Sequence, residues 1–353
     1  MVVFGVGQGH LATDPGVGQE VLAAQELIRI GESPTCDSCR AGLSPVVRLG
    51  SLDDPAGFGP VVQIARNSRS EYVVSSATFD GELLVYGEDG SFLHTVGRRG
   101  EGPGEFRRMQ LLDFDAHDSL HAVEASGPRH SVFAPDFSFA RSVQMQTRTM
   151  AMRIEGSGAV FAVAPAMTDS GSYALQRISP DGTGLAAFDS IDPGARGPAA
   201  MGRNITVDPA GRRWSVGMAD YRVKQWAEDG GLIRIFEARR EWIPGSIPMR
   251  LERDQRPPGQ MAGLEADERG LLWVFAAVPD ADWAPPSPGT RPLPKTMYDT
   301  VVEVIDPAEG TLLARSTFDD LVIPFATGFA YSMVEESSGD LRVQIWRLDL
   351  SGR

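Results

Sequence analysis

Short apolar runs, separated by turns rich in glycine, proline and aspartate, make up most of the chain after about residue 43. The runs 61–66, 72–79, 82–87 and 92–97 are rich in β-branched and aromatic side chains, and each is too short for an average helix. Similar groups of runs follow at 109–145, 149–191, 204–242 and 261–318. The pattern therefore predicts an all-β chain built from repeated antiparallel units.

One strand of the unit recurs along the chain as a recognisable sequence motif. Its fullest copy is Arg-Val-Lys-Gln-Trp at 222–226, and an acidic turn at 227–230 follows it. Related strands contain Tyr86, Phe133 and Trp346, and weaker copies lie at 175–182 and 304–310. Most copies are about 43 to 48 residues apart and one interval is about 79, which is typical of four-stranded β-propeller blades. We expect the repeated aromatic residues to pack between blades.

The last unit offers only three strands, at 323–328, 329–336 and 341–350. A strand that could complete it lies upstream at 45–50, just before the first unit. Pairing the two would close the ring and remove an open sheet edge. We therefore predict a six-bladed β-propeller over residues 43–353, closed by an N-terminal strand that joins the last blade. Residues 1–42 are predicted to be an extension, a processed or linker segment.

The link after the first unit, Gly-Arg-Arg-Gly-Glu-Gly-Pro-Gly-Glu-Phe at 97–106, resembles the Gly-x-x-Gly-x-Gly-Pro-Gly-x-Phe link of NHL-type six-bladed β-propellers. With the Cys-x-x-Cys upstream, the pattern is similar to a group of exported bacterial six-bladed propellers. The resemblance implies the fold and a periplasmic or extracellular location, whereas a likeness of fold says little about function. The Arg-Val strand is lost in the third and fifth units, where we expect distorted blades.

Charge narrows the classes of partner. The net charge of −14 argues against non-specific binding of DNA or RNA, which needs a cationic surface. No apolar stretch approaches the roughly 18 residues that a membrane helix requires. The segment 1–8 lacks the basic leader and apolar run of a secretory signal, and removal of an earlier signal stays open. We expect a monomer without a transmembrane segment.

Cys36 and Cys39 are the only cysteines. A Cys-x-x-Cys pair can be a redox couple, half of a zinc site or a disulfide. A zinc site would need two further ligands, and the chain has no second Cys-x-x-Cys. The sequence therefore favours an inert or oxidised pair, with a disulfide as one possibility.

The sequence carries no phosphate-binding loop and no Gly-x-Ser-x-Gly motif. His117 and His121 have the spacing of metal ligands on a helix, but their segment reads as strand, turn, strand. Asp113, Asp115 and Asp118 could approach calcium, and aspartates of a hairpin turn are the favoured interpretation. No cofactor is predicted, and a structural or catalytic metal stays open.

In a propeller, the links between blades and the loops between second and third strands emerge on one face around the channel. An insertion at 280–299 contributes Trp283 to this inter-blade loop face. Arginine forks suit carboxylate or phosphate groups, so the candidate ligand-binding residues are Trp283, Arg98, Arg99, Arg107, Arg108, Arg250, Arg253, Arg256 and Arg291.

The predicted function is non-catalytic binding or scaffolding of a protein or a small anionic ligand at this face, with no nucleic acid as partner. The alternative is a metal-dependent lyase or lactonase whose site lies in the central channel.

Overall fold

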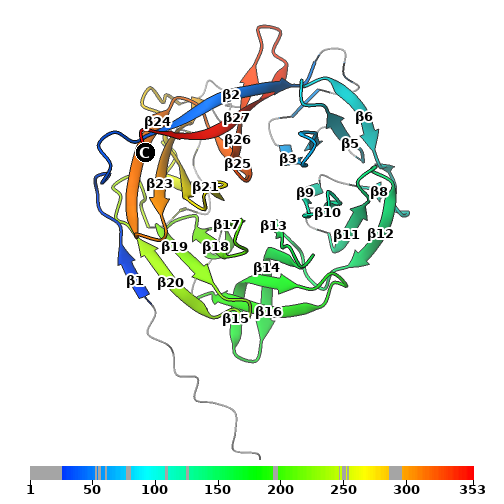
Figure 1. Cartoon of the computed structure of the whole chain (residues 1–353), viewed down its shortest axis with the longest axis horizontal. Helices are drawn as coiled ribbons and strands as arrows, with labels where there is room; N and C mark the ends of the chain where they lie inside the picture. The colour runs from blue at the N-terminus through cyan, green and yellow to red at the C-terminus, as the bar shows by residue number, and fades with distance from the viewer. Residues whose placement is uncertain are drawn as a thin grey trace, which may run out of the picture.

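The computed structural model describes residues 26–51, 54, 57–59, 62–76, 81–107, 110–124, 127–193, 198–245, 247–248, 252, 254–285 and 296–353. Six four-stranded antiparallel blades surround a central channel (Figure 1), as the repeat predicts. In each blade the strands follow one another in the sequence from the channel outwards, except that the last blade takes its outer strand from the N-terminal part of the chain.

The bounds of the strands follow the turns of the sequence. Blade one comprises β3 (Val62–Arg66), β4 (Tyr72–Ser76), β5 (Leu83–Tyr86) and β6 (Phe92–Val96). Blade two comprises β9 (Gln110–Phe114), β10 (Leu120–Glu124), β11 (Arg129–Phe133) and β12 (Phe139–Gln144). Blade three comprises β13 (Ala151–Ile154), β14 (Val160–Thr168), β15 (Gly171–Ile178) and β16 (Gly184–Ser190). Blade four comprises β17 (Arg203–Val207), β18 (Arg213–Gly217), β19 (Arg222–Trp226) and β20 (Leu232–Glu237). Blade five comprises β21 (Gln260–Ala266), β22 (Leu272–Pro279), β23 (Tyr298–Asp306) and β24 (Thr311–Phe318). Blade six contains β25 (Ile323–Ala326), β26 (Phe329–Glu335) and β27 (Leu341–Ser351).

The ring closes as predicted. Strand β2 (Arg40–Leu49) pairs antiparallel with β27, from Arg40 opposite Ser351 to Leu49 opposite Val343. The closing strand begins five residues before the predicted 45–50, because β27 is long enough to pair with this earlier stretch. The last blade thereby gains its fourth strand, and its outer edge is formed by the N-terminal part of the chain.

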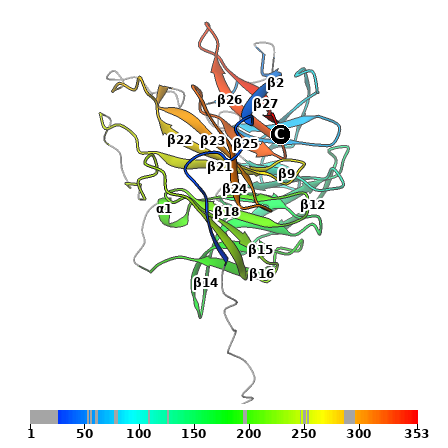
Figure 2. The ribbon, with the colours of Figure 1, turned by 60° about the vertical axis from the view of Figure 1, so that its left-hand side comes forward.

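Residues 26–39, ahead of β2, run along the outside of the ring (Figures 1 and 2). Strand β1 (Glu26–Arg29) adds in parallel to β20 as a fifth strand of blade four. Thr35 then donates both its backbone N–H and its hydroxyl to the Leu312 carbonyl of blade five. A disulfide joins Cys36 to Cys39 beside Gly352, where blade six ends. The segment thus touches three blades before it enters the ring, and the predicted domain boundary at residue 42 stays a prediction.

The core lies between neighbouring blades. Trp226 packs against Phe188, which stacks on Phe161, so aromatic rings join blades three and four. Tyr86 and Phe133 are buried at the equivalent strand of their own blades. Blades three and five lack the Arg-Val phrase but keep the same strand order, and Ile178 and Ile305 fill the aromatic position there.

The only α-helix of the described residues is the one-turn α1 (Pro198–Met201), in the link between blades three and four (Figure 2). No helix within these ranges is long and apolar enough to cross a membrane.

Candidate functional site: a pocket at one end of the channel

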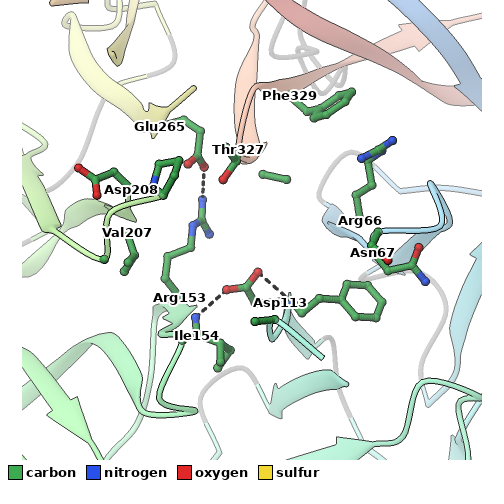
Figure 3. A pocket seen from close by; sticks show the side chains of 17 residues that line it. Arg66, Asn67, Asp113, Arg153, Ile154, Val207, Asp208, Glu265, Thr327 and Phe329 are labelled. Carbon is green, nitrogen blue, oxygen red and sulfur yellow. Dashed lines mark hydrogen bonds and ion pairs between the residues drawn. The ribbon is translucent and has the colours of Figure 1, made fainter. Parts of the chain in front are cut away.

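A pocket of about 500 Å³ opens at one end of the channel (Figure 3). All six blades contribute to its wall, through the last residues of their innermost strands and the turns that follow. The innermost strand of a blade begins at the link from the preceding blade and ends at the turn to the second strand. The pocket therefore lies at the turn end of the channel, opposite to the inter-blade loop face on which the sequence placed the candidate site.

The turns around the pocket are held by their own side chains. Asp208 begins the turn of blade four and accepts hydrogen bonds from the backbone N–H groups of Ala210 and Arg212. Its second oxygen accepts the indole N–H of Trp214 at 3.0 Å and the Nε–H of Arg212 at 2.5 Å. Carboxylates that accept two backbone N–H groups fix a tight turn. Asp267 of blade five accepts the backbone N–H groups of Arg269 and Leu271 in the same way, so the same side chain fixes the turn in both blades.

An ionic network forms one wall of the pocket. Arg153 Nη2 donates to Glu265 Oε2 at 2.8 Å, joining blades three and five across blade four (Figure 3). Glu265 is almost fully buried and also accepts the hydroxyl of Thr206 at 2.5 Å. Asp113 of blade two accepts the backbone N–H groups of Ile154 and of its own neighbour Phe114. The network thus ties four consecutive blades together at the turn end.

The pKa values of two groups in the network differ from their ordinary values. Burial raises the pKa of the Asp113 carboxyl from its ordinary 3.8 to about 6; Arg153 opposes this rise and Glu265 adds to it. Burial alone would lower the pKa of Arg153, but the charges of Glu265 and Asp113 outweigh it and raise that pKa. Arg153 therefore stays charged, while Asp113 changes its charge near pH 6.

Arg66 forms the opposite wall. Its guanidinium lies 4.4 Å from the ring centre of Phe329, and its Nη2 donates to the Ser70 hydroxyl at 2.6 Å. Its Nε–H is buried and has no hydrogen-bond partner. Within the described ranges no carboxylate forms an ion pair with this guanidinium. An arginine fork in this state suits a carboxylate or phosphate group, which it can bind with two parallel hydrogen bonds.

An alignment of the six innermost strands on the turns that follow them shows which repeat positions form the site. The residues two positions before the turn are, from blade one to blade six, Ala65, Asp113, Arg153, Thr206, Glu265 and Phe325. The network thus occupies one repeat position in four consecutive blades. At the next position, Arg66 stands where the other five blades have apolar residues, namely Phe114, Ile154, Val207, Ala266 and Ala326. Arg66 is therefore a single departure from an otherwise apolar ring of side chains.

The other end of the channel has a different character. A cavity of about 70 Å³ lies among the beginnings of the innermost strands, with mostly apolar residues such as Ile64, Met152 and Phe325 in its wall. Arg153 lines both cavities, so its side chain stands between the two ends of the channel.

The structure places three predicted arginines together in the link between blades one and two. Arg98 and Arg99 form the short strand β7, which pairs in parallel with β8 (Glu105–Phe106). Arg98 donates to Glu105 at 2.6 Å, and Arg107 forms an ion pair with Glu101. Both of these arginines are exposed, and both have a carboxylate partner within the same link. Arg99 is exposed as well.

Arg256 lies in the link between blades four and five, three blades away and so on the opposite side of the ring. Its guanidinium donates to the carbonyl oxygens of Pro279 and Asp280 at the start of the insertion. Trp283 is half-buried in that insertion, between β22 and β23. The remaining candidates lie outside the described residues: Arg108, Arg250, Arg253 and Arg291. The contribution of these side chains to binding stays a prediction.

The aspartates and histidines of blade two act within the fold. Asp118 accepts the backbone N–H and the hydroxyl of Ser68 in blade one. Asp115 Oδ2 lies 3.3 Å from Nε2 of the buried His121, whose Nδ1 lies 2.9 Å from Nε2 of His130. Burial lowers the pKa of His130 to about 3, so this ring is neutral at pH 7. The described part of the chain holds no group of three or more such side chains that could bind a metal ion.

Comparisons with known proteins agree with the architecture. A family model described as a 6-bladed β-propeller matches residues 58–133. No curated protein matches the sequence. Among solved structures, a protein of Bacteroides fragilis whose name describes it as exported is similar over 92% of this chain and 99% of its own, with 10% identity and a TM-score of 0.58.

A member of the DUF4221 family from Bacteroides vulgatus is similar over 88% of this chain and 99% of its own, with 10% identity and a TM-score of 0.60. A Bacteroides thetaiotaomicron protein of unknown function covers 88% of this chain and 76% of its own at 11% identity, with a TM-score of 0.50. Likenesses at such low identity establish the fold alone. The protein is a six-bladed β-propeller with an ionic pocket at the turn end of its channel.

Proposed function

We propose that this propeller is a non-catalytic binding protein whose turn-end pocket receives a small ligand with a carboxylate or phosphate group. One observation carries the proposal: the guanidinium of Arg66 lines the pocket with a buried, unpartnered Nε–H and without a carboxylate partner among the described residues. A buried donor left without a partner costs about 1–3 kcal/mol, more when it is charged, and an anionic ligand would remove this cost. A pocket of about 500 Å³ suits a small molecule.

Binding is favoured over a metal-dependent lyase or lactonase by the position of Arg153. Its guanidinium bonds to Glu265 and lies close enough to Asp113 to oppose the rise in that carboxyl's pKa. A metal held by these two carboxylates would meet a fixed positive charge. The ionic wall is therefore suited to orienting a polar ligand.

The arginines of the inter-blade loop face are proposed to serve a protein partner and not the channel ligand. Arg98 and Arg107 already pair with acidic residues of their own link, so their forks are only partly available to a small anion. The proposal also includes an NHL-type repeat and a periplasmic or extracellular location. A disulfide between Cys36 and Cys39 and the likeness to a protein named as exported support that location.

Titration calorimetry with acetate, succinate, inorganic phosphate and glucose 6-phosphate tests the proposal. We expect at least one of these anions to bind, and Arg66→Gln to weaken that binding about tenfold to a hundredfold, the value of a charge-assisted hydrogen bond. Arg66→Lys keeps the charge but loses the fork, so it should bind with intermediate affinity. The matched control is Arg69→Gln, on the same turn but paired with Glu71. Failure of all four anions to bind, or equal binding by folded Arg66→Gln, would contradict the proposal.

A further inference from the structure

The charges that line the pocket do not cancel locally. Arg153 stands against two carboxylates, Asp113 and Glu265, which leaves that wall with one formal negative charge when Asp113 is ionised. The remaining carboxylate in the wall, Asp208, is neutralised by Arg212. The opposite wall carries the positive charge of Arg66 alone. A bound anion would compensate the positive charge of Arg66 but not the negative charge of the wall that contains Asp113.

Asp113 is suited to receive a cationic group. Each of its oxygens accepts one backbone N–H, from Phe114 and from Ile154, and a carboxylate oxygen has a second lone pair to offer. No ion pair of Asp113 occurs among the residues that the structure describes. The charged groups that act on it are Arg153 of β13, which favours its ionised form, and Glu265 of β21, whose repulsion offsets only part of that attraction.

We propose that the ligand of the pocket is a zwitterion, an amino acid or a short peptide, whose carboxylate binds Arg66 and whose ammonium group binds Asp113. This inference rests on the proposed function and adds the second charged group of the ligand. Arg66 lies in blade one and Asp113 in blade two, so the two contacts come from neighbouring blades (Figure 3). Phe329 and Phe114 supply apolar wall for the part of the ligand between its charges.

The arrangement predicts that binding depends on pH. An ammonium group favours the ionised form of a neighbouring carboxyl, so binding lowers the pKa of Asp113 from about 6 and releases a proton below that pH. Because Asp113 is mostly protonated at pH 5 and mostly ionised at pH 7, affinity should rise about tenfold between these values. A ligand without the ammonium group should show no such gain.

The test uses two pools of probes on the full-length protein, observed by saturation-transfer NMR. One pool holds the twenty free amino acids, and the other holds tripeptides Ala-X-Ala with each residue at the centre, so the two sources of a zwitterion are separated. Each pool is repeated with N-acetylated members, which lose the ammonium group, and with C-amidated members, which lose the carboxylate. The strongest binder is then titrated by calorimetry at pH 5 and pH 7.

We expect free members to bind, N-acetylation and C-amidation each to weaken binding at least about tenfold, and affinity to rise about tenfold from pH 5 to pH 7. Asp113→Asn should remove the pH dependence, whereas the control Asp136→Asn, on an outer turn of the same blade, should keep it. The comparison of free with acetylated probes needs no variant, so a misfolded Asp113→Asn protein leaves the test intact.

Two outcomes overturn the inference and leave the proposed function standing. In the first, N-acetylated members bind as well as free ones; in the second, the simple anions bind through Arg66 but no zwitterion binds. Absence of binding by simple anions and by both pools overturns the inference and the proposed function together.

Discussion

The two ends of the channel differ in how they hold charge. At the turn end, Arg153 and Glu265 pair while largely removed from water, and the fold supplies further hydrogen bonds to the carboxylate. At the other end, the charged residues lie on exposed loops, where Arg107 pairs with Glu101 in solvent, and most of the residues that line the cavity there are apolar. Buried charges must be organised by the fold, whereas exposed ones are stabilised by water. The buried charges that the fold holds in place near the channel therefore lie at its turn end.

The largest expected effect separates buried from exposed pairing. Glu265→Gln should reduce the free energy of unfolding by about 3 kcal/mol, because it leaves Arg153 without its paired carboxylate in a buried network. Glu101→Gln, the same chemical change at the other end, should cost less than about 1 kcal/mol. Denaturation in guanidinium chloride measures both. Equal shifts of the two midpoints would show that the two ends do not differ in this way.

The next effect is a pH dependence at the turn end. The folded pKa of Asp113, about 6, lies above its ordinary 3.8, so its contribution to stability is present below about pH 3.8 and lost as pH rises through 6. The loss amounts to at most about 3 kcal/mol. Relative to the parent, Asp113→Asn should therefore gain stability as pH rises from 4 to 7, because the variant lacks the group whose contribution is lost over this range. Asp136→Asn is the control, and a curve for Asp113→Asn parallel to the parent's would contradict the shifted titration.

A smaller effect is expected at the disulfide on the outside of the ring, beside Gly352. Replacing both Cys36 and Cys39 by Ser removes a very short loop, which stabilises the fold by about 2 kcal/mol or less on the chain-entropy account. Thermal melting should fall by a few degrees, and anion binding at the turn end should not change. Loss of binding in the folded variant would mean that the segment containing Cys36 and Cys39 influences the shape of the pocket.

The smallest effect belongs to the inter-blade loop face. Reversing Arg98 and Arg99 to Glu should change the free energy of unfolding by about 1 kcal/mol or less, since both side chains are exposed. Binding of small anions at the turn end should be unaffected, while capture of an acidic partner protein should weaken and lose its salt dependence. Unfolding of this variant would identify the two arginines as ties between blades one and two.

The ring was predictable because its signal repeats. Each blade carries the same short strands and turns, so the period, the six blades and the closing strand follow from the sequence, and the structure confirms them. The pairing of β1 with β20 was not predictable, because Glu-Leu-Ile-Arg at 26–29 has no counterpart in the repeat. Its partner strand lies about two hundred residues away, and no local pattern specifies so distant a parallel pairing.

The pocket escaped sequence reasoning because no single segment contains it. Asp113, Arg153 and Glu265 each appear as one charged residue in an apolar strand, and only the ring brings them together. The sequence groups Asp113 with Asp115 and Asp118 as possible calcium ligands, but Asp115 accepts backbone N–H groups of its own turn and Asp118 accepts Ser68. Superposing the repeats on their turns would have shown the polar layer and the isolated position of Arg66.

The most direct measurement of the central claim is the NMR signal of the arginine Nε–H groups during titration with the anions named above. The signal of Arg66, assigned by its loss in Arg66→Gln, should shift and saturate, because this buried Nε–H gains a charged acceptor. The signal of Arg98, already bonded to Glu105, should stay in place. A saturable shift of Arg98 with an unmoved Arg66 would place the anion at the other end of the channel and contradict the account.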